Sequence, residues 1–106
     1  MSAITTGGRE KAYQNDGYNR YTIRQLLAPI EQTAYLCGMD YLPPFVVHGT
    51  HGMTFNEIKL AAKSYQTIII AIRDNLIDWQ KAKQLPRINS DFSSILLNQT
   101  EVKHAR

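Results

Sequence analysis

Paired threonines and glycines stand near the start of the sequence, at Thr5, Thr6, Gly7 and Gly8. Glycine permits backbone conformations that other residues avoid, and it lets a ligand approach the main chain closely. A loop of this kind ordinarily follows a strand inside a domain, so its position predicts that a part which usually precedes it is absent from these residues. Taken alone, the glycine pair favours a plain tight turn over a binding site.

Two histidines, His48 and His51, flank Gly49 and Thr50. Histidine is a common metal ligand, so the two could in principle form a metal-binding pair. No carboxylate or thiolate stands at a matching spacing, so the sequence predicts no metal site, and both histidines are expected to make hydrogen bonds near the end of a strand. Cys37 is the single cysteine, which excludes a disulfide within the chain. Its place at the apolar end of a predicted helix favours a small buried residue over a nucleophile.

The composition is that of one ordinary globular domain of 106 residues, 43% hydrophobic and 20% charged. The formal net charge is +3, but the basic residues are scattered and partly offset by acidic ones. This distribution argues against a nucleic-acid partner. The longest strongly apolar run, residues 67–72, is too short to span a bilayer. A single cysteine also fits a reducing compartment, and we expect a cytoplasmic protein.

The residues around these groups predict strands that alternate with helices. Strands are expected near residues 2–6 and 42–48, and helices near residues 22–37 and 54–82. Because strands that alternate with helices pair in parallel, this order predicts an α/β layer structure in which a right-handed crossover joins the two strands. Parallel strands need neighbours that cover both faces of their sheet. The sequence therefore describes half of a sheet.

Local signals define where both helices begin. Thr22 with Gln25, and Thr54 with Glu57, have the spacing of a capping box, in which each pair satisfies free N–H groups of the first turn. Pro29 lies inside the first helix and predicts a kink or a loosened turn just before it. The second helix is expected to bury one apolar face, formed by Phe55, Ile58, Ala62, Tyr65, Ile69, Ile72 and Leu76.

The chain divides into a first unit, residues 1–83, and a tail, residues 84–106, which is expected to be weakly ordered or to form a short helix. Half a sheet leaves apolar surface uncovered and an exposed strand edge invites pairing with another chain. We therefore expect a homodimer or a higher oligomer. The residues expected to be buried at least partly in its contacts are Leu26, Ile30, Val46 and Ile69.

The segments TTGG, GYNRYT, LLAPIEQTAYLCGM and YLPPFVVHGTH, in this order and followed by a long helix, resemble the C-terminal half of the flavodoxin-like NAD(P)H:quinone oxidoreductases. Within that family the chain is similar to the bacterial branch that includes the ancillary proteins of glutathione-regulated potassium efflux. The resemblance covers about residues 3–76. It implies the C-terminal portion of a three-layer, parallel-sheet α/β fold, truncated with respect to the family.

The resemblance also implies the site. Thr5, Thr6, Gly7 and Gly8 would contact the ring of an FMN cofactor, with FAD as the alternative flavin, and Tyr13 would lie beside the ring as a hydrogen-bond donor and stacking surface. Animal quinone reductases carry a histidine six positions after that tyrosine, where this chain has Asn19. An amide cannot relay a proton as imidazole does, so that role is not transferred. The loop that holds the flavin phosphate belongs to the half that is not included here, and FMN is therefore expected to bind weakly or not at all.

Two functions follow from this resemblance. The first is a two-electron reduction of quinones by NAD(P)H, in an FMN-dependent enzyme whose C-terminal half this chain represents and whose active site forms between the subunits of a dimer. The second is a non-catalytic ancillary or regulatory role beside a potassium-efflux transporter at the inner face of the membrane, or an inactive truncated product. Yellow colour and flavin absorbance of the purified chain would favour the first.

Overall fold

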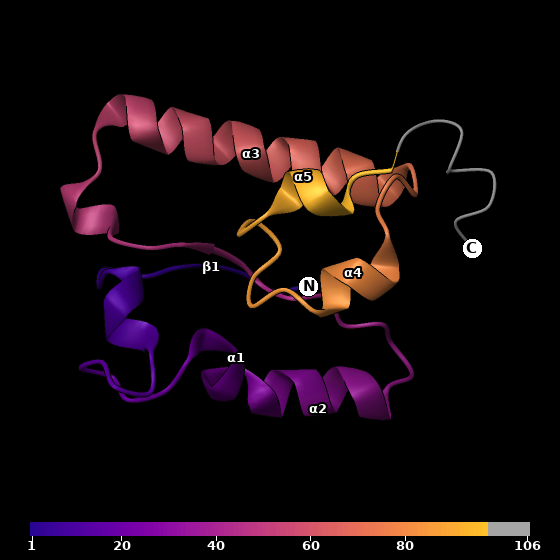
Figure 1. Ribbon diagram of the computed structural model, residues 1–106, viewed down its shortest axis with the longest axis horizontal. Helices are drawn as coiled ribbons and strands as arrows, with labels where there is room; N and C mark the ends of the chain where they lie inside the picture. The colour runs from indigo at the N-terminus through magenta and orange to yellow at the C-terminus, as the bar shows by residue number, and fades with distance from the viewer. Residues whose placement is uncertain (98–106) are drawn as a thin grey trace.

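A short parallel sheet forms the middle layer of the molecule, which was obtained as a computed structural model and describes residues 1–97. Strand β1 (Ala3–Thr5) pairs with β2 (Phe45–Val47) so that Ile4 faces Val46. Helix α3 (Phe55–Arg73) lies on one side of the sheet, and α1 (Ile23–Leu26) and α2 (Ala28–Leu36) lie on the other (Figure 1). The parallel pairing and the α/β layers are confirmed, although both strands are shorter than predicted.

The start of the first helix is confirmed in detail. The Thr22 hydroxyl accepts a hydrogen bond from the Gln25 N–H at 3.2 Å, and the Gln25 side chain accepts one from the Thr22 N–H at 2.8 Å. The predicted break is also present, because α1 ends at Leu26 and α2 begins at Ala28. Pro29 has no N–H to continue the ladder of the preceding turn. The two short helices therefore replace one regular helix.

The second long helix begins as predicted but ends earlier. Thr54 and Glu57 form the capping box of α3. The helix stops at Arg73 because Asn75 adopts a left-handed backbone with φ +57°. A single helix over residues 54–82 is therefore wrong: Ile77 leaves the helix, becomes fully buried and forms an antiparallel bridge with Leu96.

Helix α4 (Trp79–Lys83) is a separate element with its own cap. The Asp78 carboxylate accepts a hydrogen bond from the Lys81 N–H at 3.1 Å. After α4 the chain passes along the outer edge of β2, where Ile88 and Asn89 bond to Pro44 and Val46. It then forms α5 (Phe92–Ile95), the short helix that was one of the two expected states of the tail. The last nine residues of the predicted tail, 98–106, lie outside the described part of the chain.

The hydrophobic core lies between β2, the C-terminal end of α3 and the segments after it. Its buried members are Leu42, Phe45, Ile68, Ala71, Ile77, Ala82, Ile88 and Ile95. Two of them, Ile88 and Ile95, belong to the segment that the sequence pattern indicated as a tail. Helices α1 and α2 contain no buried residue. The core is therefore concentrated in the second half of the described chain.

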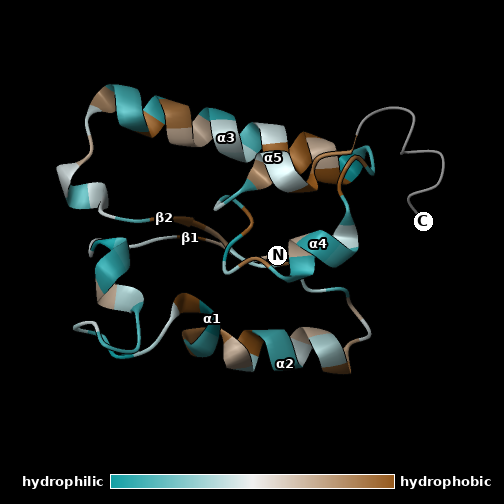
Figure 2. Cartoon of the chain, viewed as in Figure 1, coloured by the Kyte–Doolittle hydropathy of each residue, from teal (hydrophilic) through white to brown (hydrophobic). Residues whose placement is uncertain are grey.

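The predicted buried face of α3 is wrong for most of its length. Phe55, Ile58, Tyr65 and Ile69 remain 39–71% exposed, and Ile68 is among the residues buried instead. Only the C-terminal end of the helix meets the core, while a groove of about 480 Å³ lies between its N-terminal half and the two strands. Figure 2 shows apolar residues spread along this helix.

One further burial prediction is corrected by the structure. Cys37 is exposed, because the apolar end of α2 faces solvent instead of the core. Of the residues expected at subunit contacts, Val46 is buried within the chain itself, whereas Leu26 and Ile30 are half exposed, and the subunit contacts themselves stay a prediction. Within residues 1–97, no helix combines the length and the apolar character needed to cross a bilayer.

Candidate functional site

The TTGG loop begins at the C-terminal end of β1, directly beside the end of β2. The Thr6 N–H donates to the Val47 carbonyl at 2.9 Å, and both the N–H and the hydroxyl of Thr50 donate to the Thr6 carbonyl at 3.1 Å. The Gly49 N–H donates to the Gly8 carbonyl at 2.9 Å. The loops after the two strands are therefore joined into one surface, at the sheet edge where open α/β folds bind their ligands.

His48, the first residue after β2, holds the Thr6 side chain. The Thr6 hydroxyl donates its proton to the Gly8 carbonyl at 2.8 Å and also lies 2.9 Å from the Nδ1 of His48. Because a hydroxyl has one proton to donate, this pairing assigns the proton of the imidazole to Nδ1. The Nε2 of His48 is then left with a free lone pair. The predicted hydrogen bond of a strand-end histidine is confirmed here.

The backbone at Gly7 and Gly8 is open to a ligand. Both residues are exposed, and within residues 1–97 neither N–H donates a hydrogen bond. A Cβ on Gly7 would lie 2.5 Å from the Nε2 of His51, so the small residue leaves room for that ring. A Cβ on Gly8 would make only an ordinary contact, 3.5 Å from the Tyr13 ring. Two backbone donors without a partner in residues 1–97 therefore stand at the strand end.

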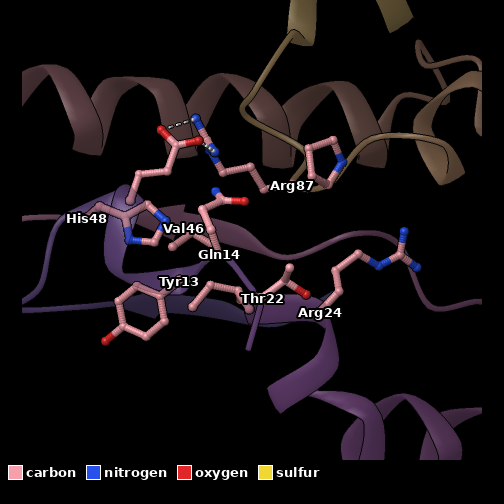
Figure 3. Close-up of a pocket in the computed structure, with 10 residues that line it drawn as sticks. Tyr13, Gln14, Thr22, Arg24, Val46, His48 and Arg87 are labelled. Carbon is pink, nitrogen blue, oxygen red and sulfur yellow. Dashed lines mark hydrogen bonds and ion pairs between the residues drawn. The ribbon is translucent and has the colours of Figure 1, made fainter. Parts of the chain in front are cut away.

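Tyr13 lies beside this loop. It ends the 3₁₀ helix Glu10–Tyr13, and its ring packs at a tilt of 34° against His48, with 5.3 Å between the ring centroids. The loop that carries it depends on Gly17, because a Cβ there would lie 2.2 Å from the Lys11 carbonyl oxygen. The structure thus brings Thr6 and Tyr13 together around His48, with Gly8 bonded to the Thr6 hydroxyl. Figure 3 shows Tyr13 beside His48.

An ion pair on the other side of His48 was not found from the sequence. Arg87 donates to the two Glu10 carboxylate oxygens at 2.7 and 3.4 Å, and this contact lowers the pKa of Glu10. Together with Tyr13 and His48 the pair lines a cavity of about 230 Å³ that reaches Thr22 (Figure 3). No local signal could reveal the pair, since Arg87 lies in the segment that the pattern indicated as a tail.

The surroundings of His48 favour its neutral form. Burial lowers the pKa of His48 first, and the nearby Arg87 charge lowers it further. The folded chain therefore binds fewer protons near pH 6 than the unfolded chain, in which a histidine titrates at about 6.5. Stability that depends on neutral His48 is present above that pH and is lost as the pH falls toward the lower pKa of the folded state.

We expect the midpoint of urea unfolding to fall as the pH is lowered from about 7 to about 5, and His48→Gln to reduce that fall. Glutamine keeps a donor for Thr6 and does not titrate, while side-chain carboxylates have ordinary pKa values of about 4. The measurement is a series of urea unfolding curves, followed by circular dichroism, for both proteins. His51→Gln serves as the control. Equal pH dependence in wild type and His48→Gln would contradict the assignment.

His51 does not combine with His48 into a metal centre. Its ring lies beside Gly7, whereas Nδ1 of His48 is used by Thr6. In the described part of the chain, no group of three or more histidine, cysteine or acidic side chains could hold a metal ion.

Comparison with known proteins agrees with the fold. The profile of a family described as having a flavodoxin-like fold matches residues 1–69. General stress protein 14 of Bacillus subtilis (strain 168) is 41% identical over 63 residues, which are 59% of this chain and 36% of that protein. The glutathione-regulated potassium-efflux system ancillary protein KefF of Klebsiella pneumoniae (strain 342) is 36% identical over 84 residues, 79% of this chain and 42% of that protein.

A related ancillary protein, KefG of Cronobacter sakazakii (strain ATCC BAA-894), is 35% identical over 63 residues, covering 59% of this chain and 34% of that protein. A crystal structure described as the thermophilic tryptophan halogenase (Th-Hal) of Streptomycin violaceusniger superimposes with a TM-score of 0.58 at 36% identity, covering 60% of this chain and 37% of the other. The chain spans 34–42% of the length of the three curated relatives. The profile match covers most of the chain and includes both parallel strands and the TTGG loop at the end of β1. The chain therefore belongs to the family of flavodoxin-like fold.

Proposed function

We propose that the joined loops after β1 and β2 contact the ring of a flavin, and that the complete protein is an FMN-dependent NAD(P)H:quinone oxidoreductase. The observation that supports this most is the pair of exposed N–H groups at Gly7 and Gly8, which have no partner within residues 1–97. Flavin-binding proteins use such donors near the pyrimidine side of the ring. A ligand can also approach Gly8 closely, because the atoms nearest to a Cβ built there belong to side chains and not to the backbone.

Each residue of the proposed site has a separate task. Gly7 and Gly8 would donate hydrogen bonds to the ring carbonyl and so favour the negative charge that reduction places there. Tyr13 would cover one side of the ring and offer its hydroxyl as a donor. Thr6 would not contact the cofactor through its hydroxyl, because the Gly8 carbonyl and His48 already engage it. The flavin itself would supply the hydride chemistry between NAD(P)H and a quinone.

These residues would hold the ring but not the phosphate of FMN. The phosphate of such a cofactor is ordinarily bound at a loop and helix N-terminus, and the residues proposed here all lie at the ring. We therefore expect the 106-residue chain to bind lumiflavin, which lacks the ribityl phosphate, with an affinity within about threefold of its affinity for FMN. The proposed residues make none of the charge-assisted hydrogen bonds to the phosphate, worth about 1.5–3 kcal/mol each, that would otherwise favour FMN.

The test is a two-dimensional NMR titration of the labelled chain with FMN and with lumiflavin, which detects weak binding residue by residue. The amides of Gly7 and Gly8 should shift most. Gly8→Val should weaken binding at least tenfold, about 1.4 kcal/mol, because its side chain would occupy the position of the ring. Gly52→Val, in a loop with open space, is the matched control. Tight stoichiometric FMN binding, or shifts remote from this loop, would overturn the proposal.

A second function is an ancillary role beside a potassium-efflux transporter, with the chain at the inner face of the membrane. The match to KefF over 79% of the chain supports it, since that protein is described as an ancillary protein of such a system. The two functions make different demands on the loop. Gly8→Val should leave an ancillary role intact, whereas it should abolish flavin binding. A transport assay in cells that carry Gly8→Val therefore separates the two.

A further inference from the structure

The chain segment around Arg87 is fixed to the outer edge of β2. Ile88 is fully buried, and its N–H donates to the Pro44 carbonyl at 2.8 Å. The Asn89 side chain takes the place of a neighbouring strand, because its nitrogen donates to the Val46 carbonyl at 2.8 Å and its oxygen accepts from the Val46 N–H at 3.1 Å. Arg87, next to these anchored residues, therefore projects from a backbone that is held in place.

Arg87 ties this segment to the helix that carries Tyr13 (Figure 3). Its guanidinium group donates to both carboxylate oxygens of Glu10, at 2.7 and 3.4 Å. Glu10 is the first residue of the four-residue 3₁₀ helix, and Tyr13 is the last. Because a 3₁₀ helix has about three residues per turn, side chains three positions apart lie on the same face. An anchor at Glu10 therefore fixes the face from which Tyr13 projects.

The other contacts of Tyr13 leave its ring room to move. The ring packs against His48 with 5.3 Å between the centroids, and in the described chain the Tyr13 side chain makes no hydrogen bond. The backbone hydrogen bonds around its helix stay inside the loop, from the Ala12 N–H to the Arg9 carbonyl and from the Asn19 N–H to the Ala12 carbonyl. A cavity of about 230 Å³ adjoins the ring. Since empty space provides no contacts on that side, packing alone does not set the position of the ring.

We infer that Arg87 is a positioning residue for Tyr13. It ties the 3₁₀ helix to the segment anchored on β2, so that the Tyr13 ring stays beside both Gly8 and His48. Arg87 lies beyond residues 1–69, which match the family profile, so the family match gives it no role. The consequence for flavin binding rests on the proposed function, in which Tyr13 covers the flavin ring. The position of Tyr13 itself is measured without a flavin.

The first test measures the contact between the Tyr13 and His48 rings by NMR, in the full 106-residue chain at pH 8. At this pH a histidine, whose ordinary pKa is about 6.5, is neutral, so the loss of a nearby charge is not mistaken for a change of protonation. Arg87→Gln removes the charge and the paired donors, and it should reduce the nuclear Overhauser effect between the two rings at least twofold. An unchanged effect in a folded Arg87→Gln chain would contradict the inference.

Arg73→Gln is the matched control. Arg73 donates to Asp74 at 2.8 Å, so this substitution also removes an arginine–carboxylate pair, but one that lies exposed at the end of α3. It should leave the contact between the two rings unchanged. An equal loss in Arg73→Gln and Arg87→Gln would show that the contact follows the net charge of the chain, and the particular role of Arg87 would be refuted.

A charge swap separates positioning from general destabilisation. Arg87→Glu alone brings two carboxylates together, and Glu10→Arg alone brings two guanidinium groups together, so each should lower the ring contact through like-charge repulsion. The double variant restores an opposite-charge pair and should recover at least half of the lost nuclear Overhauser effect. Circular dichroism checks that each variant is folded. A folded double variant that recovers nothing would overturn the inference.

The last test connects the tie to flavin binding, with lumiflavin as the probe. Arg87→Gln should weaken lumiflavin binding at least twofold in the wild-type background and have no further effect in a Tyr13→Ala background, because a residue that acts through another is not additive with it. An equal loss in both backgrounds would refute the route through Tyr13. If Gly8→Val leaves lumiflavin binding unchanged, the proposed function fails, while the ring contact still decides the role of Arg87.

Discussion

Replacing Ile95 by alanine is expected to lower the free energy of unfolding by about 2–5 kcal/mol, the cost of removing a large aliphatic side chain from a packed core. Ile95 is 1% exposed and packs with Ile77 and Ile88 in the same cluster. Since small domains have total stabilities of about 5–15 kcal/mol, this single change should remove a large share. The prediction is specific to a segment that the sequence pattern indicated as a tail.

Urea unfolding followed by far-ultraviolet circular dichroism measures this effect. Leu60→Ala is the control, because Leu60 is 70% exposed on α3 and its truncation should change the free energy by less than about 0.5 kcal/mol. If Ile95→Ala unfolded at the same urea concentration as the wild type, the packing of residues 84–97 against the core would be contradicted.

Replacing Gly17 by alanine should destabilise the chain by about 3 kcal/mol, the upper part of the range for overpacked sites. The added Cβ would lie 2.2 Å from the Lys11 carbonyl oxygen and 2.9 Å from the Ala12 carbonyl carbon and oxygen. These are backbone atoms, so no side chain can turn away. The 3₁₀ helix that carries Glu10 and Tyr13 must shift, and the fluorescence of Tyr13 and its contact with His48 should change with it.

Gly52→Ala provides the comparison for this substitution. A Cβ on Gly52 meets no atom within 4 Å, and its φ is not positive. Alanine there should leave stability unchanged or raise it by about 0.4–1 kcal/mol, since it restricts the unfolded chain. The two variants are compared by thermal unfolding. Similar melting temperatures for Gly17→Ala and Gly52→Ala would show that the loop around Gly17 relaxes at little cost.

The features that could be predicted from the sequence are those set by neighbouring residues. The capping boxes at Thr22 and Thr54 require only a threonine and an acceptor three residues later, and the break before Pro29 follows from one missing N–H. The parallel pairing follows from the order of the elements. In the candidate site, the TTGG loop and Tyr13 were named from the family resemblance, which needs only a short segment because they lie within nine residues of one another.

The features that were missed depend on contacts between distant residues. Ile77 leaves the helical path because it pairs with Leu96. The periodicity of the residues in α3 gives no indication of this pairing. Arg87 reaches Glu10 across 77 positions. The exposed face of α3 was misjudged for a related reason: helical spacing shows which residues share a face, but only the rest of the fold determines what covers it.

The position of the core also sets the order of events during synthesis. Within the described chain, the buried cluster begins at Leu42 and is complete only with Ile95. At a ribosomal rate of about 5–20 residues per second, roughly 2–10 s separate the emergence of Phe45 from that of Ile95. During this interval the apolar β2 segment, residues 45–47, has left the ribosome without the residues that bury it. The nascent chain therefore exposes this apolar segment until Ile95, the last core residue within 1–97, has also left the ribosome.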